Sequence, residues 1–248
     1  MSTVATQPGT ASTASQTPAA VQTIALQKRI DDRPILRDIN LTVAPGQYVA
    51  LLGANGAGKS TLLKILATLI PPSDGRLTLF GETVGWDGWA ARRRIGLIGH
   101  QSMLYRDLSA LENLIFFGKL YGIASPAARA VTLLKAVDLF DRADDPVKSL
   151  SRGMMQRVAI ARALVHDPEL LLADEPFDGL DAPSSRALEK LLAQLHQAGK
   201  TVILANHDID QSLRLSQRAV VLRKGRVVID QPSQELTPPA ILKEMERA

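Results

Sequence analysis

Residues 53–61 read Gly-Ala-Asn-Gly-Ala-Gly-Lys-Ser-Thr, and this stretch decides how the rest of the chain is interpreted. Its three glycines permit a tight, partly left-handed backbone that turns successive N–H groups inward. A helix expected from about Lys59 adds the positive end of its dipole to the same pocket. The stretch therefore predicts a loop that binds the phosphates of a nucleotide, formed by Gly53, Ala54, Asn55, Gly56, Ala57, Gly58, Lys59, Ser60 and Thr61.

The segments on either side of this loop stand in the order that a phosphate loop requires. Residues 48–52 are almost wholly apolar, as in a buried parallel strand, and residues 60–70 carry Leu and Ile at helical spacing before a pair of prolines. In such a loop Lys59 reaches the β- and γ-phosphates, and the Ser60 hydroxyl ligates Mg²⁺. A Gly-rich turn that binds nothing is the alternative, and this order of strand, loop and helix disfavours it.

The composition limits the classes of protein that remain. The chain has 248 residues, and its 29 basic against 25 acidic residues leave a net charge of only +4, too small an excess to indicate nucleic acid binding. The absence of cysteine excludes disulfides and thiolate metal sites. No apolar run approaches the roughly 20 residues that cross a bilayer, so we expect any membrane association to go through a partner.

The N-terminal segment differs in amino-acid composition from the rest of the chain. Residues 1–20 are rich in Ser, Thr, Ala, Gln and Pro and contain no Lys or Arg, which predicts a disordered tail rather than a secretory signal. Residues 21–248 are expected to form one domain. Within it, helical periodicity from about residue 109 to residue 149 indicates a helical subdomain inserted at about residues 102–165.

Short apolar segments outside that insert predict the strands of two sheets. Alternation over residues 75–84 indicates antiparallel β-structure, to which residues 21–26 and 35–43 add two further short strands. The remaining expected strands are residues 95–98, 170–174 and 201–205, and a hairpin over residues 220–229 that turns at Lys224-Gly225. The fold class that follows is α/β, a P-loop NTPase core with a mostly parallel sheet, an antiparallel β subdomain and the inserted helical subdomain.

Two acidic residues stand at the end of the apolar strand predicted at residues 170–174: Asp174 is its last residue, and Glu175 follows it. In a parallel sheet they reach the edge at which the phosphate loop opens. Asp174 is placed there to hold Mg²⁺, and Glu175 is placed to polarise an attacking water.

Two further polar residues follow other predicted strands. Gln101 comes after the strand at residues 95–98 and is placed to touch Mg²⁺ or the water. His207 comes after the strand at residues 201–205 and is placed to contact the γ-phosphate. Considered alone, an ordinary surface side chain is the simpler interpretation of either residue.

Residues 150–157, Leu-Ser-Arg-Gly-Met-Met-Gln-Arg, predict a second helix N-terminus suited to an anion. Ser151 can cap that helix, and Gly153 leaves room for an anion near its first turn. Because the chain has no second phosphate loop, we expect this helix to complete a site on another copy.

Together these motifs resemble the ATP-binding cassette (ABC) ATPases, the nucleotide-binding subunits of ABC transporters. The resemblance covers about residues 21–230 and rests on the phosphate loop, Gln101, the signature at residues 150–156, Leu170 to Glu175, Gly179-Leu180-Asp181 and His207.

The resemblance implies that two cassettes enclose two ATP molecules. Each ATP lies between the phosphate loop of one chain and the signature of the other, where Ser151, Gly153 and Asp181 belong to the binding site. Glu175 is then the general base, and Gln101 and His207 are further catalytic residues. Ser60, Asp174 and Gln101 surround Mg²⁺. The implied partners are transmembrane permease subunits that hold the chain on the cytoplasmic face of the cell membrane. Closure of the two cassettes drives the movement of these permease subunits.

Two departures from the family pattern stand out. Ile30 occupies the position at which the family usually has an aromatic residue that stacks on adenine, which weakens stacking. An ordinary core residue is the alternative interpretation of Ile30.

The second departure is the signature, which reads Ser-Arg-Gly-Met where Ser-Gly-Gly-Gln is commonest. This variant, with the run from Gly99 to Tyr105, is similar to the ATP-binding subunit of the haem exporter of cytochrome c maturation. The resemblance thus implies haem export. Exporters of drugs, lipids or polysaccharides, and a soluble ABC ATPase not coupled to transport, are the alternatives.

Overall fold

The computed structural model describes residues 17–85, 88–99 and 102–247. Its larger sheet has six strands in the order β10-β9-β3-β8-β7-β6. All neighbours in this sheet are parallel except β10, which runs antiparallel to β9, so the mostly parallel sheet is confirmed. The strands are β3 (Tyr48–Leu52), β6 (Ile95–Ile98), β7 (Leu170–Asp174), β8 (Thr201–Ala205), β9 (Arg218–Arg223) and β10 (Arg226–Pro232).

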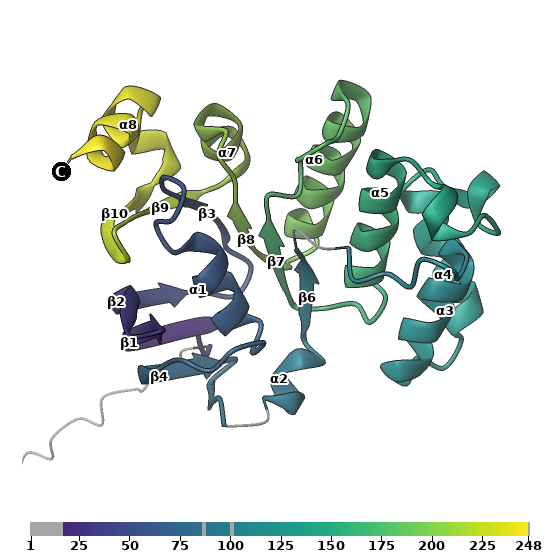
Figure 1. Cartoon of the computed structure of the whole chain (residues 1–248), viewed down its shortest axis with the longest axis horizontal. Coiled ribbons are helices and arrows are strands. Elements are labelled where there is room, and N and C mark those ends of the chain that lie inside the picture. Colours follow the sequence, from purple (N-terminus) through teal and green to yellow (C-terminus); the bar gives the residue numbers. More distant parts are fainter. Residues whose placement is uncertain (1–16, 86–87, 100–101, 248) are drawn as a thin grey trace, which may run out of the picture.

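Helices cover both faces of this sheet, which explains why its central strands are apolar throughout. Every residue of β3, β7 and β8 is buried. Successive side chains of β7 point to opposite faces: Leu172 packs in the cluster that contains α1 (Lys59–Leu66), and Leu171 in the cluster that contains α5 (Arg152–Ala163) and α6 (Ala182–Gln197). The helices α1 and α5 therefore lie on opposite faces of the large sheet (Figure 1).

A second, antiparallel sheet lies beyond α1 and has the order β2-β1-β4-β5. Its strands are β1 (Val21–Ile30), β2 (Arg33–Val43), β4 (Asp74–Leu79) and β5 (Glu82–Thr83). The β1–β2 turn places Asp31 and Asp32 at φ 46° and 61°, the left-handed conformation that tight hairpins use. Packing begins just before β1, because Ala20 is buried and its N–H donates to the Val43 carbonyl at 2.9 Å. Residues 1–16 of the expected tail lie outside the described residues.

The helix after the phosphate loop is shorter than its apolar spacing suggests. Leu and Ile continue at helical spacing to residue 70, but α1 ends at Leu66. Thr68 has φ 57°, and the N–H of Leu69 returns to the Lys64 carbonyl at 2.9 Å, which closes the helix end. The expected extent to residue 70 was wrong because a left-handed threonine cannot be read from hydrophobic spacing.

The segment between β6 and β7 is helical, as expected, and lies at one end of the large sheet (Figure 1). A capping box starts α3 (Ala110–Leu120): the Glu112 N–H donates to Ser109 Oγ, and the Ser109 N–H donates to Glu112 Oε2. This segment also contains α4 (Pro126–Ala136), α5 and the 3₁₀ turns η1 (Phe140–Arg142) and η2 (Val147–Ser149). That residues 102–165 act as a separate subdomain stays a prediction.

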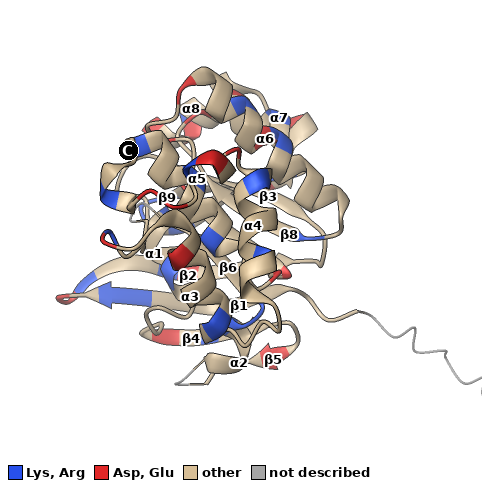
Figure 2. Cartoon of the chain, turned by 90° about the vertical axis from the view of Figure 1, so that its right-hand side faces the viewer, with Lys and Arg blue, Asp and Glu red and all other residues tan. Residues whose placement is uncertain are grey.

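The remaining elements are short helices and one 3₁₀ turn. They are α2 (Trp89–Arg92), α7 (Ile209–Leu215), η3 (Ser233–Glu235) and α8 (Pro238–Glu246). The predicted hairpin is confirmed as β9 and β10. Among the residues that the structure covers, no helix combines the length and apolarity needed to cross a membrane. Basic and acidic residues are interspersed over the face drawn in Figure 2.

Candidate nucleotide-binding site

The predicted phosphate loop connects β3 to α1 and is held between two other strands. A Cβ placed on Gly58, whose φ is 109°, would lie 2.6 Å from Leu36 Cδ2 of β2, and one on Gly53 would collide with the Leu222 carbonyl of β9. Both positions therefore need glycine for space as well as for conformation. The loop is fixed at the carboxyl end of β3, where the first turn of α1 begins.

Lys59, the first residue of α1, turns back into this loop. Its side chain is only 7% exposed, and Nζ donates to the carbonyls of Gly53 at 2.7 Å and Ala54 at 3.4 Å. Neutral carbonyls compensate a buried cation poorly, whereas an anion compensates it well. The environment of Lys59 thus fits a phosphate group at the N-terminus of α1.

Ser60 and Asp174 bring two oxygen atoms together beside Lys59. Ser60 Oγ donates to Asp174 Oδ1 at 3.1 Å, and Asp174 is buried at the end of β7. A hydroxyl and a carboxylate are oxygen ligands of the kind that Mg²⁺ prefers. This pair fits the predicted metal position.

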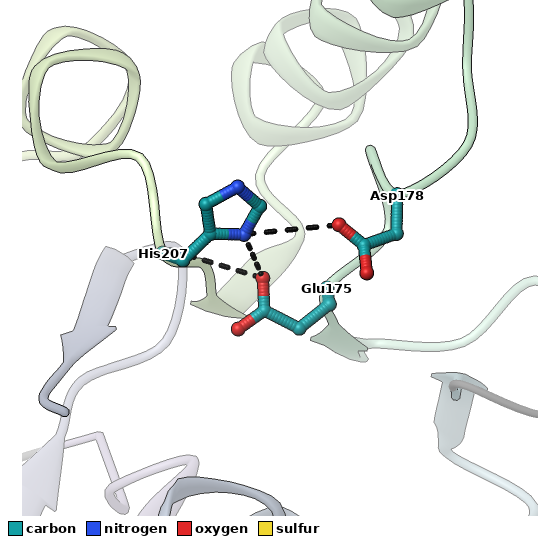
Figure 3. A group of neighbouring side chains, drawn as sticks. All are labelled: Glu175, Asp178 and His207. Carbon is teal, nitrogen blue, oxygen red and sulfur yellow. Dashed lines mark hydrogen bonds and ion pairs between the residues drawn. The ribbon is translucent and has the colours of Figure 1, made fainter. Parts of the chain in front are cut away.

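Glu175 follows β7 and His207 follows β8, and the two side chains meet at the same edge of the sheet (Figure 3). Glu175 Oε2 accepts from the His207 backbone N–H at 3.1 Å and lies 2.9 Å from His207 Nδ1. Glu175 itself has φ 50°, which is uncommon for a residue with a side chain and often marks a functional position. The two predicted residues are therefore brought into direct contact.

Asp178 is a third member of this group, and the sequence analysis did not include it. Its Oδ1 lies 3.7 Å from His207 Nδ1. The only signal in the sequence is an acidic residue three positions after Glu175. That signal is weak, because it depends on how the loop after β7 turns.

The contact with Glu175 favours the protonated form of His207. The hydrogen bond that His207 donates to the Glu175 carboxylate, more than any other cause, raises the pKa of His207 above its ordinary value of about 6.5. A folded-state pKa above the unfolded one stabilises the folded chain below the unfolded pKa, and that stabilisation is lost as the pH rises through the folded value. The contact is therefore expected to weaken on the alkaline side of the ordinary histidine range.

Glu175→Gln is expected to lower the pKa of His207, because a neutral amide does not stabilise the imidazolium. An NMR titration of the His207 ring, assigned with His207→Gln, measures this. Glu189→Gln serves as the control, since Glu189 pairs with Arg214 instead. An unchanged His207 pKa in Glu175→Gln would contradict the assigned contact.

The predicted signature residues lie at the first turn of α5. Ser151 is its N-cap, and its Oγ accepts from the Met154 N–H at 3.2 Å. Asp181 caps α6 in the same way, because its carboxylate accepts from the Ser184 N–H at 2.9 Å. Hydrogen bonding to the Ser184 side chain, and next to its N–H, lowers the pKa of the Asp181 carboxyl. Among the described residues, no hydrogen bond joins Ser151 to Lys59, whose ammonium donates to the carbonyls of Gly53 and Ala54. A nucleotide contact by Ser151, Gly153 or Asp181 stays a prediction.

Two predicted residues remain. Gln101 lies outside the described residues, so its role stays a prediction. Ile30 ends β1 with its side chain 45% exposed, which argues against an ordinary core residue. Adenine stacking on Ile30 also stays a prediction.

Comparisons with known proteins agree with this arrangement. Residues 36–178 match the family model described as ABC transporter. A Nod factor export ATP-binding protein from Cupriavidus metallidurans is 38% identical over 220 residues, which cover 88% of this chain and 73% of that protein. A linearmycin resistance ATP-binding protein from Bacillus subtilis is 35% identical over 205 residues, which cover 82% of this chain and 66% of that protein.

Solved structures are similar over nearly the whole chain. The cbiO1 protein of Clostridium perfringens, described as part of an ABC transporter complex, is 28% identical with a TM-score of 0.79, and the match covers 91% of this chain and 93% of cbiO1. A bacterial ABC transporter cassette solved as a dimer is 30% identical with a TM-score of 0.80, covering 86% of this chain and 98% of that one. The chain therefore belongs to the ABC transporter family and is an ABC-type ATPase cassette.

Proposed function

We propose that this chain is the ATP-hydrolysing subunit of an export-type ABC transporter. The observation that carries the proposal is the succession of groups at one sheet edge: the buried ammonium of Lys59, the Ser60–Asp174 pair and the Glu175–His207 pair. These are the groups that bind a nucleoside triphosphate with its metal and hold a water for attack. The relatives named for Nod factor export and linearmycin resistance support export as the direction of transport.

Each group has one task in this proposal. Lys59 binds oxygens of the β- and γ-phosphates, and Glu175 accepts the proton of the attacking water. His207 orients the Glu175 carboxylate through Nδ1 and contacts the γ-phosphate. Ser60 and Asp174, with Gln101, would hold Mg²⁺, which neutralises part of the phosphate charge when bound.

The signature supports a paired arrangement of two chains. Ser151 is exposed at the N-terminus of α5, a 12-residue helix whose free N–H groups and dipole suit an anion. Since the sequence has no second phosphate loop, the anion that α5 meets is the ATP of another cassette. A related cassette forms a dimer in its solved structure, which supports this pairing.

An aromatic surface on the helical segment supports a membrane partner. Tyr105 and Phe116 are exposed, their ring centroids are 5.0 Å apart, and Phe117 lies 5.4 Å from Phe116. Exposed Leu120 continues this surface along α3. Adjacent exposed apolar groups on a folded protein mark a site of interaction. We assign this surface to permease subunits that hold the chain on the cytoplasmic face of the cell membrane.

The site residues support the ATPase activity, whereas the proposal for the cargo rests on the signature sequence and on the names of the relatives. The sequence variant Ser-Arg-Gly-Met resembles that of a haem exporter, and haem remains one proposed cargo. The named relatives support a drug, lipid or polysaccharide exporter better, because one exports Nod factor and another confers linearmycin resistance. A soluble ABC ATPase outside transport is the remaining alternative.

Recovery of the chain with membranes tests the transport assignment. We expect the wild-type chain to sediment with membranes from its own cell and to be released when its permease is deleted. The double variant Tyr105→Ser, Phe116→Ser is expected to remain in the supernatant while it keeps its ATPase activity. The matched control is Phe140→Ser, because Phe140 is 43% exposed, close to the 40% of Phe116, but lies in η1. A chain that never sediments, or equal release by both variants, would contradict a permease bound at this surface.

A further inference from the structure

The side chain of Arg152, the first residue of α5 and the signature residue after Ser151, lies on the backbone of Gly179. A Cβ placed on Gly179 would lie 2.7 Å from Arg152 Nε and 3.0 Å from both Cδ and Cζ. Gly153 also lies close, because a Cβ on it would stand 3.8 Å from the Gly179 carbonyl and 3.8 Å from Leu180 Cδ2. The first turn of α5 is thus packed against the loop that follows Glu175.

A second link joins α5 to the same loop. Gln156 Nε2 donates to the Pro176 carbonyl at 3.2 Å, one residue after Glu175. Arg152 and Gln156 line a cavity of about 160 Å³ together with Glu175, Asp178, Ser102 and Met155. The guanidinium therefore contacts the loop backbone and shares a cavity with the two carboxylates that face His207.

We propose that Arg152 is a positioning residue. It holds the loop at residues 176–181, and through this loop Glu175, in a fixed position relative to the N-terminus of α5. This inference rests on the proposed function, in which α5 faces the partner's ATP and Glu175 acts on the chain's own ATP. A shift of α5 against the partner's ATP is then transmitted to Glu175 through the contact between Arg152 and Gly179. Glycine, the commonest residue at this signature position, has no side chain to make the contact, so the link is a property of the Arg152 variant.

Arg152→Ala separates positioning from binding. We expect kcat to fall about tenfold at saturating ATP, the scale for a slightly misplaced catalytic group, with Kd for ATP changed less than about twofold. Arg152→Lys keeps the stem on Gly179 and the positive charge, so it should recover most of the rate. The matched control is Arg186→Ala on α6, which removes an exposed arginine and should keep the wild-type rate.

A double variant tests the contact itself. Gly179→Ala has two costs, because Gly179 has φ 74° and because its new Cβ meets Arg152. In an Arg152→Ala background only the first cost remains, so Gly179→Ala should lower kcat by a clearly smaller factor than in the wild type. Equal factors in both backgrounds, a wild-type kcat in Arg152→Ala, or a loss confined to Kd would overturn the inference alone. A wild-type chain that does not hydrolyse ATP would overturn the proposed function and this inference with it.

Discussion

Lys59→Ala is expected to remove most ATP binding. The variant takes away the only side-chain cation identified in the loop, while the phosphates keep their negative charge. A hydrogen bond to a charged group contributes about 1.5–3 kcal/mol, so Kd should rise roughly ten- to a hundredfold. Isothermal titration with ATP and Mg²⁺ measures it.

The control for this variant is Lys190→Ala, which removes an exposed lysine of α6 and should leave Kd unchanged. A melting curve of each nucleotide-free variant checks the fold. We expect no loss of stability in Lys59→Ala, because the buried ammonium is bonded to carbonyls and not to a carboxylate. Unchanged affinity in Lys59→Ala would remove the basis for the phosphate-loop assignment.

Glu175→Gln is expected to separate binding from hydrolysis. The amide keeps the size of the side chain but cannot accept a proton, so the rate should fall about a hundredfold or more while ATP still binds. Steady-state phosphate release and ATP titration give the two quantities. Asp178→Asn is the informative comparison, since Asp178 also faces His207 but at 3.7 Å. We expect Asp178→Asn to keep most of the rate. A Glu175→Gln variant that hydrolyses ATP normally would mean that the base is elsewhere.

The sequence predicts the position of the acidic edge well for a simple reason. Strands β7 and β8 are apolar throughout, and parallel strands bring their carboxyl ends to one edge. Glu175 and His207 are 32 residues apart in the chain, yet each follows such a strand, so their contact can be anticipated from strand order alone. The glycine loop is predictable in the same way, because its place between a strand and a helix is local.

The features that sequence patterns do not predict depend on backbone conformation in loops. The end of α1 at Leu66 depends on the left-handed Thr68. The approach of Asp178 to His207, and of Arg152 to Gly179, depends on the turn after Glu175. Hydrophobic periodicity contains no information on these turns, since their side chains are polar or absent. The exposure of Ile30 likewise follows from the hairpin at Asp31 and Asp32 rather than from its apolar character.

The central claim is that two chains share each ATP site. The molar mass of the Glu175→Gln variant in solution tests this claim most directly. Light scattering should give the mass of one chain without nucleotide and twice that mass with saturating ATP and Mg²⁺, because closed sites no longer turn over. Adding Ser151→Arg to the same chain should prevent the doubling, since it places a bulky side chain at the N-terminus of α5. A variant that binds ATP but keeps the mass of one chain would contradict the account.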